Sequence, residues 1–561
     1  MSALVTPHGI TGVLSLHRTF VDLMLFTTVC FAKIFFWFVV SMSAAASSAS
    51  VVDDEFDVAI IGGGLAGALT GIALKKVASR HLPAPGLRVA IFESYSAASN
   101  GCLSNGAWLT IGCNGVRLLT QLGLADAVRA ASHESAGIEL FNEDFVLLGD
   151  IPMNTELLLP PVGTVGAEGV PRPPRARSIR RSTLLDLLTR EAAALGVVLV
   201  YGKVLSAVST GTARHSLISF VDGTAVSADL VVGADGVHST VRKIIDPTAA
   251  PPVFAHLTNL GGTIDLSLPE SADLANSAQY RSSQYRMVFG RKTFFAYTVD
   301  KQLNILYWIA NSHSSDPSVT ASIPKTERKA HLAECFKDDL IPPVQELLRG
   351  FPASHEAELI WTNQWSLPTV RRWTGLPAAP LVLVGDAAHA ASPSSGQGVS
   401  MAAEDAAVLA MCIRDVVLKP GPAATESGAS SRLLQDAVLV QAALDKYVAV
   451  RQSRAEAVVR YGDQNSSGKA EASWFSRKVR NGFMRFGLWM GKRHIVRAST
   501  WLFDYHLCLE EGAAGLRADD GAGDYKRSFI ATTTAASAQQ PTVKGSSTTD
   551  FSSRPDMPAP S

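Results

Sequence analysis

The chain has 561 residues, of which 47% are hydrophobic, and its 50 basic and 50 acidic residues leave no formal net charge. This length allows two or three domains with sizeable cores. The balanced charge gives no reason to expect nucleic acid or an acidic macromolecule as the main partner. The six cysteines form no C-x-x-C pair and do not cluster with histidines. We therefore expect neither a disulfide framework nor a metal site.

An apolar leader, residues 1–50, opens the chain. Within it, residues 23–42 are almost wholly apolar and about long enough to span a bilayer, and small residues of the kind that signal peptidases cleave follow them. Two interpretations stay open. The leader is a signal anchor or signal peptide that associates the protein with a membrane, or translation starts at Met42 and the protein is cytoplasmic.

A strand–turn–helix–strand pattern follows the leader. The apolar run Phe56–Ile61 ends in three glycines, Leu65–Val77 is rich in Ala and Leu, and Leu87–Phe92 is a second apolar run. Such a βαβ unit predicts a parallel sheet.

The glycines of this unit form a G-x-G-x-x-G motif, Gly62, Gly64 and Gly67. Gly62 allows the tight turn, Gly64 lets a pyrophosphate approach the backbone, and Gly67 lets the helix pack closely on the strand. Glu93 ends the second strand, where a carboxylate accepts hydrogen bonds from ribose hydroxyls and repels a 2′-phosphate. The motif predicts a dinucleotide site but does not distinguish FAD from NAD.

Two further buried strands are each followed by an Asp–Gly or Gly–Asp pair. Asp229–Val232 leads to Asp235-Gly236, and Leu381–Val384 leads to Gly385-Asp386. Ligands of open α/β sheets bind at the carboxyl ends of the strands. We therefore expect three strands that are distant in sequence to bring their polar groups to one edge of the sheet.

Residues 251–375 alternate between apolar and polar as half-exposed antiparallel strands do. We predict strands at Tyr285–Val288, Thr293–Val299 and Asn304–Ile309, with alternate aromatic residues facing a pocket. These aromatics are Tyr285, Phe289, Phe294, Phe295, Tyr297, Tyr307 and Trp308. They suggest an aromatic or apolar substrate, although ordinary sheet core explains any single one equally well.

The rest of the chain is helical and then polar. Val399–Asp415 and Leu434–Arg460 show helical periodicity. Residues 515–561 are rich in Ala, Ser, Thr, Gln and Pro, and this composition predicts a disordered tail.

Together these motifs resemble the signatures of the flavoprotein aromatic hydroxylases, which include p-hydroxybenzoate, salicylate and 3-hydroxybenzoate hydroxylases and related FAD epoxidases. The most specific segment is Gly385–Ala406, GDAAHAASPSSGQGVSMAAEDA. The resemblance implies an α/β fold: a Rossmann-like FAD-binding domain with a parallel sheet, an inserted antiparallel-sheet substrate domain and C-terminal helices. The corresponding predicted domains are 51–250 with 376–440, then 251–375, then 441–514.

The resemblance also implies roles for single residues. Asp386 would bind the ribityl chain of FAD, and Asp235-Gly236 would contact FAD and assist transient NAD(P)H binding. Arg181 matches the flavin-contacting arginine of the family, with Arg180 as the alternative match. Pro393 would lie near the flavin ring.

The segment Gly396, Gln397 and Gly398 would form a loop beside the flavin. A helix that opens near Val399 directs its N-terminal N–H groups toward this loop, where they suit the negative charge of reduced flavin. No catalytic acid or base is identified from the sequence. One position departs from the family pattern, because Ser400 stands where many members have Asn, and this puts the subgroup in doubt.

The implied activity is insertion of one oxygen atom from O2 into an aromatic or planar apolar substrate through a flavin C4a-hydroperoxide, with NAD(P)H as reductant. Three alternatives stay open: epoxidation of an isoprenoid or polyene, a flavin-dependent reductase, and a flavin-binding protein without catalytic activity. The sequence does not indicate the oligomeric state.

Four conspicuous side chains have structural explanations that we favour. His389 belongs to the cofactor motif and is expected to be structural rather than a general base, and His238 is expected to be a surface neighbour of its turn. Trp361 and Trp365 are a near miss to the W-x-W-x-I-P motif of flavin halogenases, and their spacing favours core packing.

Overall fold

The computed structural model describes residues 51–82, 86–96, 108–135, 137–153, 174–210, 216–318, 323–339, 341–375, 380–418, 434, 436–467, 474–503, 505, 507 and 509. The predicted leader and the predicted disordered tail, 515–561, lie outside the described residues. So does the segment 23–42, on which the expectation of membrane association depended. Within the described part of the chain, no helix combines the length and the apolar character that crossing a bilayer requires.

The first sheet is the predicted parallel sheet, with a small antiparallel extension. Its parallel strands lie in the order β8 (Val198–Tyr201), β2 (Val89–Glu93), β1 (Val51–Ile61), β11 (Ala225–Gly233) and β17 (Leu381–Leu383). The antiparallel strands β10 (Ser216–Phe220) and β9 (Leu205–Thr210) extend it beside the first half of β11. Each strand predicted from an apolar run is therefore present, although β1 begins five residues and β11 four residues before the predicted start.

Helices cover this sheet. α2 (Leu65–Ala78) packs between α6 (Arg181–Ala194) and α13 (Gly398–Ile413), and α13 in turn contacts α4 (Cys113–Gln121) and α14 (Ala437–Ser467). Because α13 has neighbours on several sides, nearly all of its residues are buried, polar ones included. The two predicted helices of this region are confirmed, although α14 continues past the expected end at Arg460.

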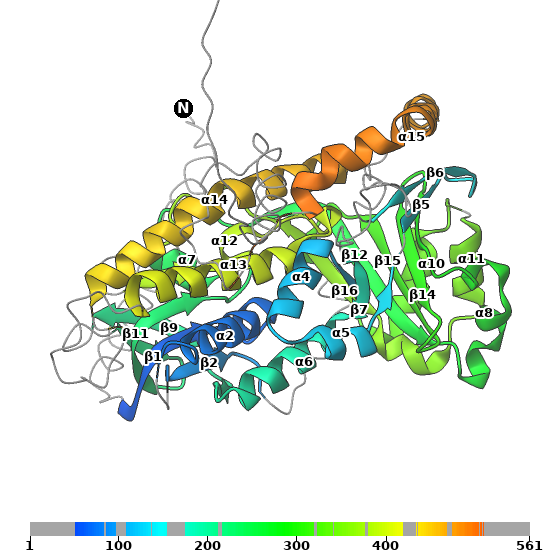
Figure 1. The fold of residues 1–561 in the computed structure, drawn as a ribbon. Coiled ribbons are helices and arrows are strands. Elements are labelled where there is room, and N and C mark those ends of the chain that lie inside the picture. Colours follow the sequence, from blue (N-terminus) through cyan, green and yellow to red (C-terminus); the bar gives the residue numbers. More distant parts are fainter. Residues whose placement is uncertain are drawn as a thin grey trace, which may run out of the picture.

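The second sheet is mainly antiparallel and forms the other half of the molecule (Figure 1). Its strands lie in the order β16 (Ile360–Ser366), β12 (Val253–Asp265), β15 (Ile305–His313), β14 (Phe294–Asp300), β13 (Tyr285–Phe289), β5 (Gly137–Phe141) and β6 (Leu147–Pro152). β5 pairs parallel to β13. The β5–β6 hairpin thus joins this sheet although it comes from within the segment 51–250.

Alternation along these strands gives the second sheet two different faces, as the sequence predicted. Phe295, Tyr297 and Trp308 face a core shared with α8 (Ala272–Asn276), α10 (Arg328–Cys335) and α11 (Pro342–Arg349). Tyr285, Phe294, Ala296 and Tyr307 lie on the opposite face, and Trp108, Met153 and Ala176 pack against them. We call Tyr285, Phe294, Ala296 and Tyr307, together with Trp108 packed on them, the aromatic face.

A small third sheet adjoins both halves. It consists of β3 (Trp108–Ile111), β7 (Arg177–Arg180) and β4 (His133–Glu134), with α5 (Ala125–Ala130) nearby. β3 contacts β15 of the second sheet, while β7 runs directly into α6, which covers the first sheet. Residues at the end of β7 therefore lie where the two halves meet.

The chain returns to both halves at its C-terminal end. α15 (Trp474–Phe503) has a non-helical residue, Gly491, that divides it into two parts, and the helix packs against β6 (Figure 1). Beyond it, Arg117 and Gln121 of α4 donate hydrogen bonds to the carbonyl groups of Tyr505 and Leu507.

Candidate active site

Four neighbouring strands end in one row, and each is followed by one of the predicted motifs. Phe92 of β2 pairs with Ile61 of β1, Ile61 with Gly233 of β11, and Gly233 with Leu383 of β17. The residues that follow are Glu93, Gly62, Asp235 and Gly385. The prediction that segments distant in sequence meet at one edge of the sheet is confirmed.

The three motif glycines occupy three different environments. A Cβ atom on Gly62, whose φ is +107°, would lie 2.4 Å from the carbonyl oxygen of Ala234, and one on Gly67 would lie 2.0 Å from the carbonyl oxygen of Gly62. Around a Cβ on Gly64, by contrast, no described atom lies within 4 Å. Gly62 and Gly67 therefore allow packing, whereas Gly64 leaves open space beside the backbone at the N-terminus of α2. That space suits a pyrophosphate.

Glu93 joins the glycine turn to the end of β2. Its buried carboxylate accepts hydrogen bonds from the Gly63 N–H at 2.6 Å, the Tyr95 N–H at 2.9 Å and the Ser94 hydroxyl at 3.0 Å. Two carboxylate oxygens have about four acceptor positions, so roughly one stays available for a ribose hydroxyl.

The turn after β11 presents a carboxylate oxygen with no partner. One oxygen of Asp235 accepts hydrogen bonds from the N–H groups of Thr240, at 2.7 Å, and Val241, at 3.1 Å, and so caps α7 (Thr240–Ile245). The other, Oδ1, is buried and makes no hydrogen bond within the described part of the chain. Gly236 has a φ of +77°, which favours glycine at this turn. A buried acceptor without a donor is costly, so Oδ1 is suited to a ligand hydroxyl or N–H.

Arg242 connects this turn to the Gly–Asp segment. Its buried guanidinium donates hydrogen bonds to the carbonyl oxygens of Ala387, at 2.9 Å, and Val237, at 2.6 Å. The two motifs are thereby fixed relative to each other. No role for Arg242 was predicted from the sequence.

Gly385 and Asp386 follow β17. Gly385 has a φ of +60°, and a Cβ there would lie 2.7 Å from the Cβ of Ala66, so glycine is required for α2 to pack at this point. Asp386 has solvent-accessible surface, but surrounding protein atoms at this edge of the first sheet limit its hydration. The resulting desolvation raises the pKa of Asp386, while His389 and Arg181 partly offset the effect.

The two adjacent arginines at the end of β7 act on different sites. Arg181 is close enough to Asp386 to favour its charged form. Arg180 instead acts on Tyr307 of the aromatic face, where burial raises the pKa of the phenol and Arg180 opposes that rise. This division favours Arg181 over Arg180 as the residue near the cofactor. Trp108 of the aromatic face pairs with Arg180, and α6 begins at the next residue, so β7 connects the aromatic face to the helices of the first sheet.

The loop leading into α13, residues 393–398, combines exposed residues with a buried, hydrogen-bonded glutamine. Pro393, Gly396 and Gly398 are exposed, and a Cβ on either glycine would have no described atom within 4 Å. Gln397 is fully buried and accepts a hydrogen bond from the Asn114 amide at 3.0 Å, while its own Nε2 donates none within the described residues.

Ser400, the position that departs from the family pattern, has a structural role in this chain. Its hydroxyl accepts a hydrogen bond from the Gly112 N–H at 3.2 Å, directly before α4. A Cβ on Gly115 would lie 2.6 Å from the same hydroxyl oxygen. The tight packing of α4 on α13 therefore suits a side chain as small as serine.

A buried charge network supports this loop from behind. Asp405 accepts hydrogen bonds from the Gly385 N–H at 2.8 Å and from the Arg451 Nε at 2.8 Å, and it contacts His389 Nε2 at 2.6 Å. Glu404 accepts from Arg451, Arg454 and the Asn114 amide at 2.6 to 2.7 Å. Burial would raise the pKa of Asp405, but His389 and Arg451 outweigh it and lower the value to about 2. α14 is thus held to the cofactor loop by charged groups that remain ionised.

The structure adds two polar residues beside the aromatic face that the sequence analysis missed. The buried His133 ring stacks on Tyr307, its Nε2 lies 3.1 Å from the Thr298 hydroxyl, and its Nδ1 lies 3.7 Å from Asp300. Neither His133 Nδ1 nor Asp300 Oδ2 has a hydrogen-bond partner within the described residues. Nothing in the local sequence distinguishes these two residues, because they come together only through the pairing of the strands.

The four side chains with expected structural roles lie as follows. His389 is buried between Asp405 and the ring of Trp373, and Trp361 belongs to the core of the second sheet. His238 is exposed at its turn and meets the ring of Trp365 edge to face. A search of the described residues finds no cluster of His, Cys, Asp or Glu that could hold a metal ion.

These features fit FAD. The open space at Gly64 suits the pyrophosphate, Glu93 and Asp235 offer acceptors for hydroxyl groups, and the exposed glycines at 396 and 398 allow a flat ring to approach the backbone. The buried Nε2 of Gln397 is an additional unused donor at this loop.

Comparisons with known proteins agree with this fit. A model of the FAD binding domain matches residues 55–432. An aurachin C monooxygenase/isomerase of Stigmatella aurantiaca is 27% identical over 428 residues, which are 75% of this chain and 93% of that protein. A kynurenine 3-monooxygenase of Salinispora arenicola is 28% identical over 370 residues, which are 64% and 72% of the two chains. Klebsiella pneumoniae HpxO, solved with FAD and uric acid, has the same fold: the TM-score is 0.57, the identity 18%, and the match covers 79% of this chain and 97% of that one.

Proposed function

The chain belongs to the FAD-dependent monooxygenases that share this FAD-binding domain, and we propose that it inserts one oxygen atom from O2 into an aromatic or planar apolar substrate, with NAD(P)H as reductant. FAD, when bound, supplies the redox and oxygen-transfer chemistry. The chain itself supplies binding, orientation and a site that excludes water.

One observation carries the proposal: Trp108 of the aromatic face pairs with Arg180 at the end of β7, and the next residue, Arg181, lies near enough to Asp386 of the cofactor motif to lower the pKa of that carboxyl group. A substrate on the aromatic face would therefore lie beside the group held at the edge of the first sheet. The face is lined by Trp108, Tyr285, Phe294 and Tyr307, which suits a flat, apolar molecule.

We assign the following tasks to the residues of the first sheet. The N–H groups at the start of α2, reached past Gly64, hold the pyrophosphate, and Glu93 holds a ribose hydroxyl. Asp386 binds a hydroxyl of the ribityl chain, and His389 and Arg181 favour the charged form of that carboxyl group against the desolvation that raises its pKa. The N-terminus of α13 stabilises negative charge that develops beside Gly396 and Gly398.

The test uses the full-length protein reconstituted with FAD. NADH or NADPH oxidation and O2 consumption are followed against a panel of phenols, indoles and polyenes under ¹⁸O2, with mass analysis of the products. We expect one aromatic substrate class to stimulate oxidation of the reductant and to gain a single ¹⁸O atom. Stimulated oxidation without any oxygenated product would overturn the proposal.

The same panel separates the alternatives. An epoxide formed from a polyene, with phenols unchanged, would assign the protein to the epoxidases. Turnover that continues without O2 would identify a reductase. The matched control is D386N, which we expect to lose FAD affinity and all three activities together because it alters the cofactor site and not the aromatic face.

A further inference from the structure

The first part of α15 turns a row of large apolar side chains away from the protein. Phe475, Val479, Phe483, Phe486 and Met490 follow one another at intervals of three or four residues, so they share one side of the helix. Trp474 and Trp489 flank them. We call these seven residues the outer face of α15. Their side chains are strongly exposed: Phe483 at 79% and Trp489 at 78% are the most extreme.

The opposite side of the same helix is firmly attached to the second sheet. Leu488 is buried against Leu140 and Leu148. Arg477 and Asn481 donate hydrogen bonds to Glu143 beside β5, at 3.2 and 2.9 Å. Burial raises the pKa of Glu143, but these bonds outweigh that effect and lower it. The orientation of the helix is therefore fixed, and the exposure of its outer face follows from that orientation.

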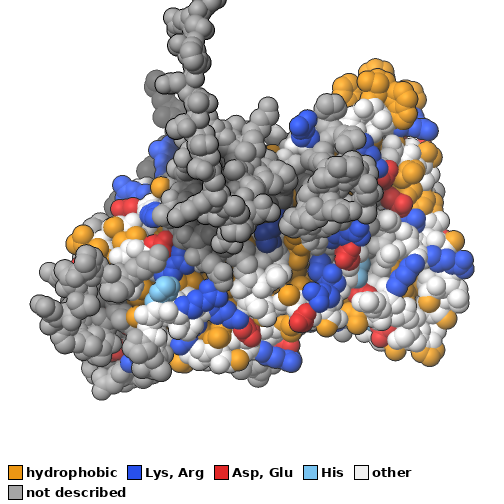
Figure 2. Space-filling view, in the orientation of Figure 1, with side chains coloured by type: hydrophobic (Ala, Val, Ile, Leu, Met, Phe, Trp, Pro, Cys, Tyr) orange, Lys and Arg blue, Asp and Glu red, His pale blue; other side chains and the backbone are white. Residues whose placement is uncertain are grey.

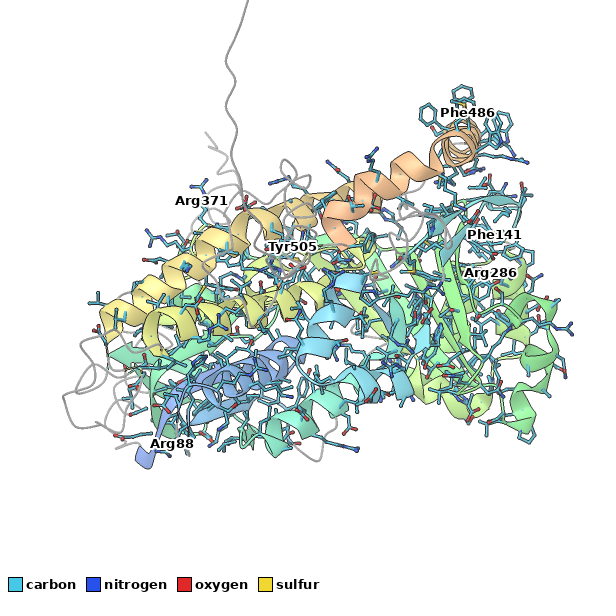
Figure 3. The ribbon with its side chains drawn as sticks, viewed as in Figure 1. Arg88, Phe141, Arg286, Arg371, Phe486 and Tyr505 are labelled. Carbon is cyan, nitrogen blue, oxygen red and sulfur yellow. The ribbon has the colours of Figure 1, made fainter. Side chains whose placement is uncertain are left out.

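No comparable patch occurs elsewhere in the described part of the chain. Every strongly exposed Phe, Trp and Met residue among the described residues lies on α15, whereas the other exposed apolar residues are Val, Leu and Tyr scattered over several elements. Figure 2 shows hydrophobic side chains gathered at the end of this helix, and Figure 3 shows Phe486 pointing away from the body of the protein. Large apolar patches on a soluble protein usually mark an interaction site.

The charge of the helix indicates what kind of partner would fit. Residues 474–503 contain seven basic residues and no acidic one. Lys478 and Arg485 are exposed on the same part of the helix as the outer face. Lys478 lies 4.0 Å from Asp144, an exposed pair that water largely screens. Positive charge therefore flanks the apolar residues and faces the same surroundings.

We propose that the outer face of α15 lies in the surface of an anionic lipid bilayer. Phe and Trp side chains would enter the boundary between headgroups and acyl chains, and the flanking Lys and Arg side chains would contact anionic headgroups. The helix would lie in the plane of the membrane and would not cross it. A second copy of the chain fits less well, because α15 itself contains no acidic residue, so a symmetric contact between two outer faces would bring the exposed basic side chains of both helices together.

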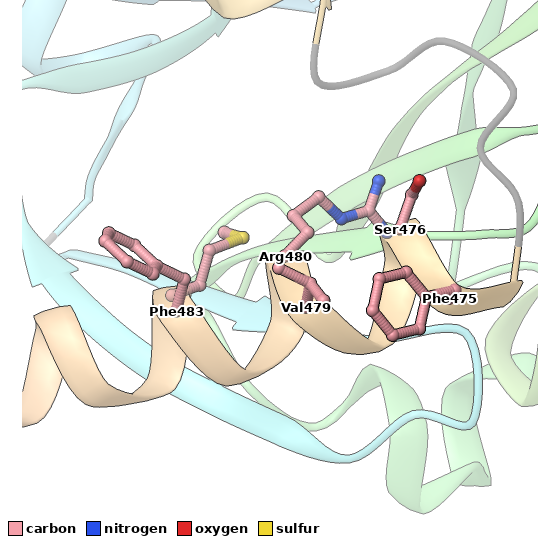
Figure 4. Close-up of a pocket in the computed structure, with 6 residues that line it drawn as sticks. Phe475, Ser476, Val479, Arg480 and Phe483 are labelled. Carbon is pink, nitrogen blue, oxygen red and sulfur yellow. The ribbon is translucent and has the colours of Figure 1, made fainter.

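The outer face also forms a shallow groove. Phe475, Val479 and Phe483 line it with Ser476, Arg480 and Met484 (Figure 4). Arg480 lies near the ring of Phe289 in the second sheet, so its stem stays on the inner side of the groove. Apart from Ser476 and Arg480 this lining is apolar, which suits an acyl chain next to an anionic headgroup.

The experiment is flotation of the full-length protein with vesicles of phosphatidylcholine alone or of phosphatidylcholine with 30% phosphatidylglycerol, on the order of the anionic content that attracts basic helices. We expect binding to the anionic vesicles that weakens as salt rises. The double variant F483S/W489S should bind at least about tenfold less, the order expected when two apolar anchors are removed. The matched control V221S/V438S removes exposed apolar residues from other elements and should bind as the wild type does.

Further measurements test whether the double variant is folded and whether Trp489 enters the bilayer. Circular dichroism and FAD uptake establish that the double variant is folded. Quenching of tryptophan emission by brominated lipid should occur in the wild type and fall in W489F. Absence of binding to anionic vesicles, or binding that the double variant retains in full, would overturn the proposal. A dimer in solution that F483S/W489S converts to a monomer would overturn it in favour of a second copy.

Discussion

Alanine at Gly64 should separate cofactor binding from folding. Gly64 has φ −72° and ψ −173°, a conformation open to any residue, and no described atom lies within 4 Å of the added Cβ. The free energy of unfolding without cofactor should therefore change by less than about 1 kcal/mol. The methyl group would, however, occupy the space through which a phosphate reaches the backbone N–H groups of α2.

The expected loss of affinity follows from the bonds at stake. Losing one hydrogen bond from an N–H group to a charged phosphate costs about 1.5 to 3 kcal/mol, so FAD should bind roughly ten to a hundred times more weakly. Quenching of flavin fluorescence measures the affinity, and denaturant unfolding of the cofactor-free protein measures the stability.

Alanine at Gly67 is the matched comparison. Its Cβ would lie 2.0 Å from the carbonyl oxygen of Gly62, so the turn must distort. We expect G67A to lose more than about 2 kcal/mol of stability even without cofactor. Wild-type FAD affinity in G64A, or equal destabilisation by both variants, would refute the reasoning about where the cofactor approaches.

Three further outcomes are expected. R242L should cost about 2 to 4 kcal/mol of unfolding free energy, because it leaves the buried carbonyl group of Ala387 and the partly buried one of Val237 without this donor. Denaturant titration measures the loss, and a smaller loss than in an exposed arginine variant such as R190L would contradict this reasoning. The pKa of Asp405 is lowered to about 2, below its ordinary 3.8, so this carboxylate stabilises the fold above about pH 4 by about 2 kcal/mol, and the effect disappears as pH falls toward 2. Unfolding measured from pH 7 to pH 2.5 should therefore show a weaker acid dependence in D405N, and an unchanged dependence would count against the network. R181M should weaken FAD binding about tenfold, the order of one lost interaction with a charged group. R180M should leave FAD affinity unchanged and raise the KM of the substrate. If both variants changed FAD affinity and KM equally, the two side chains would not act on separate sites.

Much of the fold could be predicted because its signals are local. The apolar runs at β1, β2, β11 and β17 end at the residues where the motifs begin, and alternation along β14 and β15 predicts which aromatic side chains share a face. The glycine turn and its following carboxylate were likewise visible from spacing alone, since the backbone there tolerates few alternatives.

What could not be predicted depends on contacts between distant segments. β5 and β6 are short strands whose pairing with β13 no local pattern indicates. His133 and Asp300 meet only because β4 lies beside the second sheet. The charge network had one local signal, because Arg451 and Arg454 are three residues apart on one helix and Glu404 precedes Asp405. No local pattern, however, indicates that these two pairs meet across the intervening loop.

The orientation of α15 also could not be predicted from the sequence. Residues 474–490 have the periodicity of an ordinary amphipathic helix, and the usual expectation is that the apolar side packs inward. Here the inner side is formed by Arg477, Asn481 and Leu488, and only the tertiary contacts with β5 and β6 show which side faces out.

The position of β17 has a consequence for how the protein is made. Its three residues pair with the second half of β11, but they are synthesised only after all strands of the second sheet have been synthesised. During that interval the second half of β11 has an unpaired edge, which in a nascent chain is a site for misassociation. The carboxyl edge that receives the cofactor is completed still later, when Arg451 emerges to neutralise Asp405. A chain truncated before α14 would therefore be expected to contain every cofactor motif and still fail to mature, which pulse-labelled translation of staged truncations can test.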